Sequence, residues 1–251
     1  MLITLPASAH GEAAPTSVLD LEPLIAYARQ CRADAVSLMP PPGADDLPNA
    51  AALLAMKNSL EASGLQVVGG SWRVAENAPV SAPAWQAETL FEARALVAAI
   101  GEAGVDPLVV EWCAPCEEPA GRQSLIGVLK PLVGEAERAG VRLAIGGSLS
   151  RKGIAALLCE LDSRSLGFCL EAAVSTGDSH AEWLRSLALR LYAVRLPTSD
   201  PAPGADAARA DTVRMLRSLR FTGPLHLQPS GTPVETARAA GLIQGLRMAR
   251  D

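Results

Sequence analysis

Histidine, regularly spaced cysteine and long uncharged apolar runs are all scarce in this sequence, and each scarcity excludes a class of protein. The 251 residues include only 3 His, too few for a site built from a large histidine cluster. The 5 Cys are odd in number and scattered, which favours a reducing cytoplasm over a disulfide framework. Charges interrupt every apolar stretch within about a dozen residues, so we expect no transmembrane helix. The first ten residues lack the basic start and long apolar run of a signal peptide.

Basic residues are also slightly fewer than acidic ones. Lys and Arg number 22 against 27 Asp and Glu, a net charge of −5. An acidic balance argues against a nucleic acid or an anionic membrane as a partner. A chain of this length buries roughly three quarters of its unfolded surface and needs no disulfides to hold a core. These properties predict a cytoplasmic globular protein.

One pattern recurs along the chain: an amphipathic helix, a Gly or Asp, and then a short apolar strand. A glycine directly after a helix is the expected left-handed cap, and short runs of Val, Leu and Ile indicate strands buried on both faces. The predicted strands are 2–5, 34–38, 65–68, 107–112, 141–145, 166–170, 191–196 and 224–228. The predicted helices are 21–32, 51–63, 87–103, 124–139, 152–160, 181–189, 206–219 and 234–250.

Eight such units in about 250 residues match the α/β class and, within it, a single (β/α)8 TIM barrel spanning residues 1–251. An open doubly wound sheet is the alternative. It would normally show a glycine-rich phosphate turn after its first strand, and LPASAHGEAAP is not one. The apolar setting of Cys31, Cys159 and Cys169 predicts core residues. His226 is expected to be a neutral, hydrogen-bonded core histidine.

The sequence and spacing of these units resemble those of the xylose-isomerase-like TIM barrels, the sugar phosphate isomerase/epimerase superfamily. The segments that carry the resemblance are ARQCRADAVSL, LEASGLQVVGGSW, EAERAGVRLAI, LGFCLEAAVSTGD, LYAVRLPTSD and FTGPLHLQPSGTPVETARAAGLIQGLR. The resemblance implies a divalent metal at the top of the barrel, held by carboxylates and histidines at the ends of strands 5 to 8. Related barrels often pair near this mouth, which leaves a homodimer open.

This sequence departs from the family pattern at nearly every ligand position. The replacements are Gly146 for the Glu of strand 5, Glu171 for the Asp of strand 6, Val174 for the second His, Arg195 for the His of strand 7, and Gln228 for the Glu of strand 8. Arginine stays protonated and cannot coordinate a cation, and a neutral amide cannot act as a base. We therefore expect no metal and no other cofactor, and no proton transfer between two glutamates of the family type.

Arg195 and Glu171 end adjacent predicted strands. We expect the Arg195 guanidinium to fill the region of the metal, to pair with Glu171, and to bind a carboxylate, a phosphate or sugar hydroxyls. A structural salt bridge in an inactive site is the alternative interpretation. Glu111, at the end of the fourth strand, is the further candidate acid or base, and Arg73 is a candidate for a second contact to an anion.

Other candidates follow from the ends of the remaining strands. Trp72 and Trp112 offer flat faces to a sugar ring, with plain packing as the alternative. Gln228 is a candidate ligand contact, and His10 is the one candidate catalytic histidine, with a surface loop as the alternative. Cys113 and Cys116 match a Trp-Cys-x-Pro-Cys redox motif, although the acidic residues that follow oppose a reactive thiol.

Three functions remain at this point. The first is a divergent sugar isomerase/epimerase-like barrel that binds a small sugar, sugar phosphate or sugar acid at its C-terminal mouth without the metal. The second is a non-catalytic binding or scaffold protein with the same fold. The third is a thiol-redox protein that uses Cys113 and Cys116.

Overall fold

The alternation of helices and strands closes into a barrel of parallel strands. The structure is a computed structural model, and it describes residues 2–6, 21–38, 50–74, 82–112, 119–147, 149–171, 178–197, 205–228 and 233–248. The strands are β1 (Leu2–Pro6), β2 (Ala35–Leu38), β3 (Gln66–Val74), β4 (Leu108–Trp112), β5 (Leu143–Gly147), β6 (Leu166–Glu171), β7 (Leu191–Pro197) and β8 (Pro224–Gln228). Each strand pairs with the next in sequence, and β1 pairs with β8, which closes the barrel. The predicted (β/α)8 fold is confirmed.

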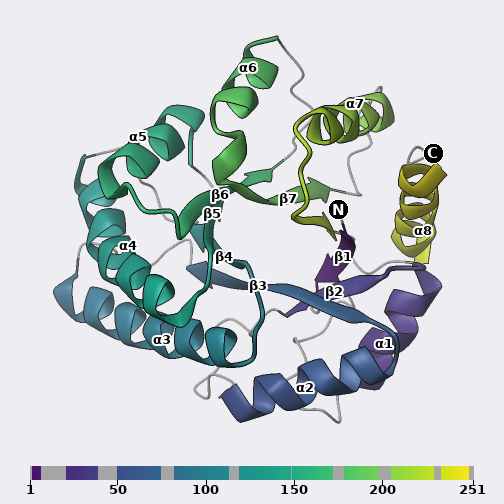
Figure 1. Cartoon of the computed structure of the whole chain (residues 1–251), viewed down its shortest axis with the longest axis horizontal. Helices are drawn as coiled ribbons and strands as arrows, with labels where there is room; N and C mark the ends of the chain where they lie inside the picture. The colour runs from purple at the N-terminus through teal and green to yellow at the C-terminus, as the bar shows by residue number, and fades with distance from the viewer. Residues whose placement is uncertain are drawn as a thin grey trace.

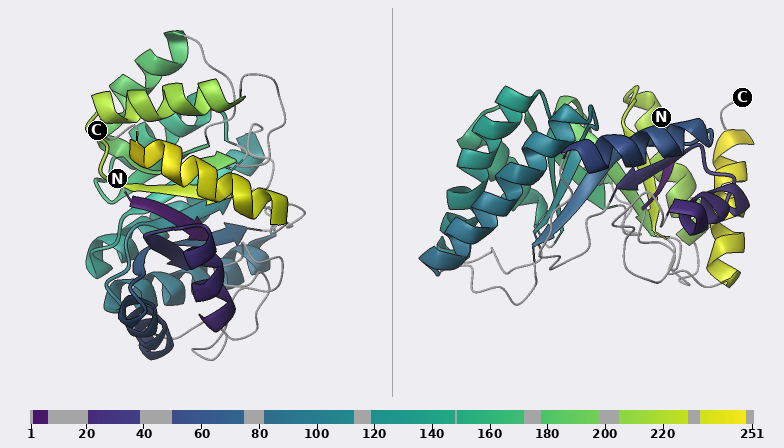
Figure 2. Two further views of the ribbon diagram at one scale, coloured as in Figure 1. Left: turned by 90° about the vertical axis from the view of Figure 1, so that its right-hand side faces the viewer. Right: turned by 90° about the horizontal axis from the view of Figure 1, so that it is seen from below.

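The helices form the outer ring of the barrel (Figure 1). They are α1 (Leu21–Gln30), α2 (Ala50–Ala62), α3 (Pro83–Glu102), α4 (Pro119–Ala139), α5 (Arg151–Leu161), α6 (Asp178–Ser186), α7 (Ala205–Ser218) and α8 (Pro233–Met248). When the molecule is turned so that its right-hand side faces the viewer, α8 and α1 lie in front of the strands (Figure 2). No helix among the described residues is both long and apolar enough to cross a membrane.

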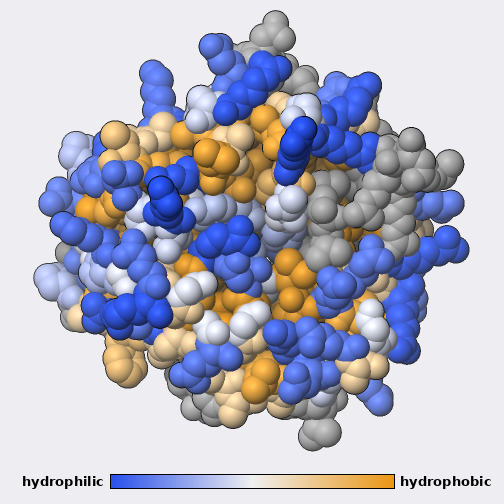
Figure 3. All heavy atoms as spheres, in the orientation of Figure 1, coloured by the Kyte–Doolittle hydropathy of each residue, from blue (hydrophilic) through white to orange (hydrophobic). Residues whose placement is uncertain are grey.

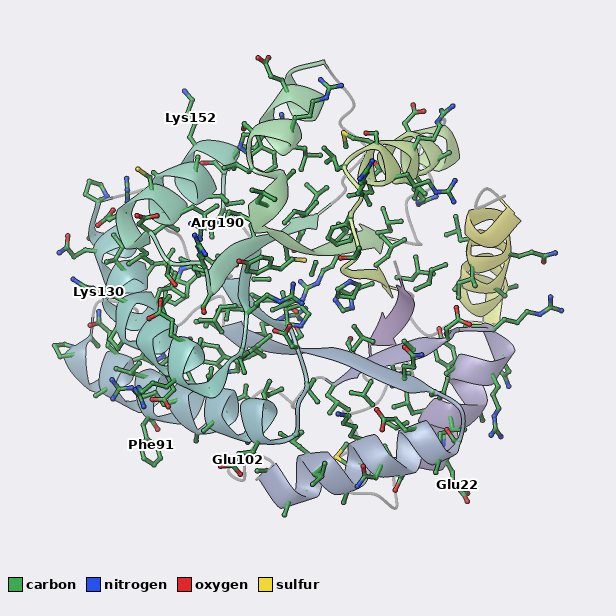
Figure 4. The ribbon with its side chains drawn as sticks, in the orientation of Figure 1. Glu22, Phe91, Glu102, Lys130, Lys152 and Arg190 are labelled. Carbon is green, nitrogen blue, oxygen red and sulfur yellow. The ribbon has the colours of Figure 1, made fainter. Side chains whose placement is uncertain are left out.

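The main core lies between the strands and the helices. Side chains such as Leu96, Leu129, Leu143 and Phe168 are fully buried there. The polar faces of the helices point to solvent, as the labelled Glu22, Lys130 and Lys152 do in Figure 4. Phe91 is an exception, because this apolar side chain of α3 also points outward and is 76% exposed.

The interior of the barrel holds a second, smaller cluster of mostly small residues. It contains Val109, Ala144, Cys169, Tyr192 and Ala193. Because successive side chains of a strand point to opposite faces, the residues two positions after Val109, Cys169 and Ala193 also face the lumen, nearer to the C-terminal ends. The small side chains below leave the upper lumen to longer, polar ones.

Charged side chains join the strands at their N-terminal ends. The Asp106 carboxylate accepts hydrogen bonds from the backbone N–H and the Nε–H of Arg142, both at 2.7 Å. The Arg142 guanidinium in turn lies over the ring of Tyr192, 5.2 Å from its centre. Figure 3 shows hydrophilic side chains in the middle of the molecule, with hydrophobic ones beside them. In barrels of this kind, interactions at the N-terminal ends contribute to stability rather than to catalysis.

Three sequence-based expectations need correction. β3 runs to Val74 rather than ending at 68, because the strand continues through the glycine pair 69–70 with a shift of register against β2. α3 and α4 begin several residues earlier than predicted, each at a proline, which the first turn of a helix accommodates. Cys159 is exposed on α5, whereas Cys31 and Cys169 are buried as expected.

Candidate functional site

Arg195 crosses the lumen near the C-terminal ends of the strands. From β7, its Nη2 donates a hydrogen bond to Ser71 Oγ on β3 at 2.8 Å and another to Glu111 Oε1 on β4. In a closed order of eight strands, β3 and β7 lie on opposite sides of the barrel. The Arg195 residue is only 5% exposed. Its guanidinium therefore occupies the middle of the upper lumen.

The carboxylate of Glu111 is the common partner of this cluster. Its Oε1 accepts a hydrogen bond from Ser71 Oγ at 2.6 Å, in addition to the one from Arg195. Its Oε2 accepts a hydrogen bond from Arg73 Nε at 2.8 Å. Glu111 is 3% exposed, so this carboxylate is buried between two guanidinium groups. Hydrogen bonds to charged groups of this kind are among the strongest in proteins.

The two ends of the cluster are open to solvent. Arg73 has 52% of its side chain exposed, and Glu171 has 48% exposed. Glu171 Oε1 lies 3.4 Å from Arg195 Nη1, so the pair expected from the adjacent strand ends is present. The closer carboxylate partner of Arg195, however, is Glu111. The charges alternate from Arg73 through Glu111 and Arg195 to Glu171, buried in the middle and exposed at both ends.

The electrostatic surroundings keep the central pair ionised. Burial would raise the pKa of Glu111, but Arg195, Ser71 and Arg73 together hold the pKa of this carboxyl below its ordinary value. Burial would lower the pKa of Arg195, but the negative charges around the guanidinium, including Glu111 and Glu171, hold it above its ordinary value. A proton is therefore not shared between the two groups at neutral pH.

Two further titratable groups pack beside Arg195 and stay neutral. Burial, with the charge of Arg195 as a second cause, lowers the pKa of His226 to about 3. Burial also raises the pKa of the Cys169 thiol to about 12. The expected burial of the histidine at position 226 is confirmed, and the direction of its pKa agrees with a neutral ring. At neutral pH these groups add no charge to the cluster.

The structure brings four of the predicted site residues together: Arg73, Glu111, Glu171 and Arg195. Gln228 ends β8 beside β7, as expected, but its side chain lies outside the described part of the structure. His10, Cys113 and Cys116 also lie outside the described residues.

Trp72 and Trp112 do not reach the lumen, which corrects their expected placement. Trp112 follows the inward-facing Glu111 on the strand and is fully buried against the helix layer, with its ring centre 6.1 Å from that of Trp85 on α3. Trp72 stands between two residues that bind Glu111 and is 8% exposed. Strand alternation therefore turns both rings away from the site.

Ser71 is the member of the cluster to which the sequence patterns assign no role. A signal for it exists, since Ser71 and Arg73 are two positions apart and so share a face of the strand. An expected strand end at 68 places both residues in the following loop, where a two-residue spacing does not indicate a shared face. In the structure β3 extends past both residues and delivers their side chains to Glu111.

The described residues do not form the divalent metal site that the resemblance implies. A Cβ added at Gly146 would lie 3.3 Å from the Cβ of Cys169, so the wall there is already packed without a ligand side chain. The Arg195 guanidinium occupies the space between Glu111 and Glu171, where it repels a cation. Among the residues described, no group of three His, Cys, Asp or Glu is arranged to hold a metal ion.

The closed order of eight parallel strands defines the class of fold: the chain has the fold of the xylose-isomerase-like TIM barrels. Among solved structures it is similar to a D-allulose 3-epimerase from Methylomonas sp. in complex with D-allulose, with 12% identity, a TM-score of 0.75, and coverage of 99% of this chain and 96% of the other. No protein-family model and no curated protein sequence matches it.

Two further structures show the same likeness. A xylose isomerase domain protein from Planctomyces limnophilus has 16% identity and a TM-score of 0.72, with 98% of this chain and 96% of the other covered. A 3-keto-D-glucoside 4-epimerase from E. coli has 14% identity and a TM-score of 0.72, with 99% of both chains covered. At these identities the likeness establishes the fold, whereas any shared chemistry must be argued from the site.

Proposed function

We propose that this protein binds a small carbohydrate or carbohydrate derivative at the C-terminal mouth of its barrel, and that it does so without a divalent metal. The observation that carries the proposal is the Arg195 guanidinium, held across the lumen by Ser71 and Glu111. Active sites of TIM barrels lie at this end of the strands. The solved structures with the same fold include sugar epimerases, one of them with D-allulose bound.

In this proposal Arg195 supplies the fixed positive charge of the site, and Glu111 is a positioning residue. Glu111 orients both guanidinium groups, and its oxygens are already occupied by three donors. The catalytic role expected for Glu111 from the sequence is not part of this proposal, because three donors of the protein already occupy the oxygens that would have to reach a proton of the ligand. Glu171 is better exposed for contact with a ligand, since nearly half of its side chain faces solvent.

The same geometry limits the chemistry. Epimerisation with one carboxylate on each face of the sugar requires two accessible bases, and Gln228 cannot serve as one. We infer that any reaction here uses Glu171 alone to move a proton next to a carbonyl group, with Arg195 stabilising the negative charge that develops on oxygen.

A binding or scaffold protein without catalysis is the second candidate. The observation that favours it is the closeness of the Glu111–Arg195 pair, which fills the upper lumen with an interaction internal to the protein. The two candidates differ in whether the exposed ends of the cluster, Arg73 and Glu171, contact a ligand.

Calorimetric titration with pentoses, hexoses, their keto forms, aldonates and phosphates tests the proposal, in EDTA and again with Mn²⁺. We expect saturable binding that EDTA does not weaken and that Glu171→Gln does weaken. Glu160→Gln, an equivalent change on the outer helix α5, is the control and should bind like the unmodified protein. Binding that requires Mn²⁺ contradicts the proposal, and no binding by any of these compounds favours the scaffold.

A further inference from the structure

We infer that the ligand of this site carries an anionic oxyacid group, a carboxylate or a phosphate, which Arg73 binds, and a hydroxyl group, which donates to Glu171. This inference rests on the proposed function and makes the ligand class more specific. It depends on the asymmetry between the two exposed ends of the cluster, one positive and one negative.

Arg73 is oriented for an anion before any ligand arrives. Its Nε–H is committed to Glu111 at 2.8 Å, and since a guanidinium is planar, this bond restricts the orientation of both Nη groups. Among the described residues, neither Nη of Arg73 has a hydrogen-bond partner, and half of the side chain is exposed. Paired N–H donors on a fixed plane match the two oxygens of a carboxylate or a phosphate.

The charges around Arg73 leave room for another anion. Arg73 shares its carboxylate partner, Glu111, with Arg195, whereas Arg195 has Glu171 as a further partner. Glu111 is the only ion-pair partner of Arg73 within the described part of the chain. The exposed side of Arg73 is therefore the place in the cluster where an anionic group would meet a guanidinium rather than a carboxylate.

The opposite end of the cluster prefers a hydrogen-bond donor. Glu171 contacts Arg195 through Oε1 at 3.4 Å and is otherwise open to solvent within the described structure. An ionised carboxylate accepts hydrogen bonds and repels a second anion, so it favours a hydroxyl. The ligand would then be oriented, with its acidic group toward β3 and a hydroxyl toward β6.

Calorimetric titration with matched probes tests the inference. D-gluconate and D-glucitol share a carbon chain and differ in having a carboxylate or a neutral terminal carbon. D-glucose 6-phosphate and D-glucose make the same comparison for phosphate. The variants are Arg73→Gln, which removes the charge, and Arg73→Lys, which keeps the charge without the paired donors. Arg94→Gln, at an exposed arginine of α3, is the matched control.

We expect one anionic probe to bind roughly ten- to a hundredfold more tightly than its neutral partner, the range for a charge-assisted hydrogen bond. Arg73→Gln should abolish this preference, Arg73→Lys should retain part of it, and Arg94→Gln should leave it intact. A preference for D-gluconate over D-glucitol would indicate a carboxylate ligand, and a preference for D-glucose 6-phosphate over D-glucose would indicate a phosphate ligand. Because the preference is electrostatic at a half-exposed site, it should weaken as salt is added.

The contrary outcomes are distinct. Equal binding of the anionic and neutral probes overturns the inference and leaves the proposed function standing. An anion preference that survives in a folded Arg73→Gln variant, verified by circular dichroism, overturns the assignment to Arg73. Absence of binding by all four probes and by the neutral sugars and keto sugars overturns both the inference and the proposed function.

Discussion

Replacing Glu111 by glutamine is the sharpest test of the cluster as a physical unit. The carboxylate accepts three hydrogen bonds, two at Oε1 and one at Oε2. Glutamine keeps one acceptor oxygen, but its NH₂ group would face a guanidinium donor, and Arg195 would stay buried without its main counter-charge. Removing one partner of a buried ion pair costs roughly 3–5 kcal/mol, and the retained acceptor places this change near about 3 kcal/mol.

Urea unfolding at pH 7, followed by circular dichroism, measures this cost. For a chain of this size, about 3 kcal/mol corresponds to a fall of roughly 6–12 °C in melting temperature. The matched control is Glu160→Gln, which removes a carboxylate from a surface pair with Arg122 in which both side chains are more than 40% exposed. The expected loss there is about 0–1 kcal/mol. Equal losses in the two variants would refute the buried cluster.

The same variant has a defined pH dependence. The pKa of Glu111 is below its ordinary value of 4.5 in the folded protein, so its contribution to stability is present above that value. The contribution is lost as the pH falls through the folded pKa, because the unfolded state takes up the proton first. The Glu111→Gln variant should lack this portion of the acid sensitivity. A double change with Arg195→Met should cost less than the sum of the single changes, because both buried charges are removed.

Four other predictions concern a buried histidine, two glycines and the response to metal. The pKa of His226 is about 3 in the folded protein against an ordinary value of 6.5, so the stability of the protein should fall as the pH drops from 6.5 toward 3. His226→Gln should remove this contribution. In urea unfolding between pH 6.5 and 4.5, the free energy of unfolding of the variant should therefore depend less steeply on pH, by at most about 1.4 kcal/mol per pH unit. A persistent slope would contradict this. Gly147→Ala should lower stability by at least about 2 kcal/mol, because φ is +97° and the new Cβ would collide with the Trp112 carbonyl. Gly134→Ala, inside α4 with open space around it, should instead raise the free energy of unfolding by up to about 1 kcal/mol and so raise the melting temperature. Adding EDTA or Mn²⁺ should leave the melting temperature unchanged, and a rise with Mn²⁺ concentration would show that the folded state binds metal.

The ends of the strands show how far local patterns reach. The pairing of Glu171 with Arg195 could be expected from sequence, because the two residues end adjacent strands and the register of a parallel pair places them side by side. For Trp72 and Trp112 the structure favours plain packing, the alternative to a face for a sugar ring, because the side of the strand on which a residue stands decides whether it reaches the lumen. Each tryptophan stands next to a residue that faces the lumen, and since successive side chains of a strand alternate, both rings are expected to face the helices.

The sequence by itself determined the fold class. Repeated helix, glycine and apolar strand units specify the local structure, and eight parallel units of this length have few ways to bury their apolar faces other than a closed barrel. It also determined which chemical groups are present at the strand ends: an arginine and a glycine where metal ligands were expected.

Only the tertiary structure decided how those groups combine. Glu111 and Arg195 are 84 residues apart and come from strands that are not neighbours, so their contact depends on the diameter of the lumen and on the reach of the arginine side chain. The small residues beneath them leave the space into which that side chain extends. A pattern along the chain carries no information about distances across a barrel, because closure alone sets them.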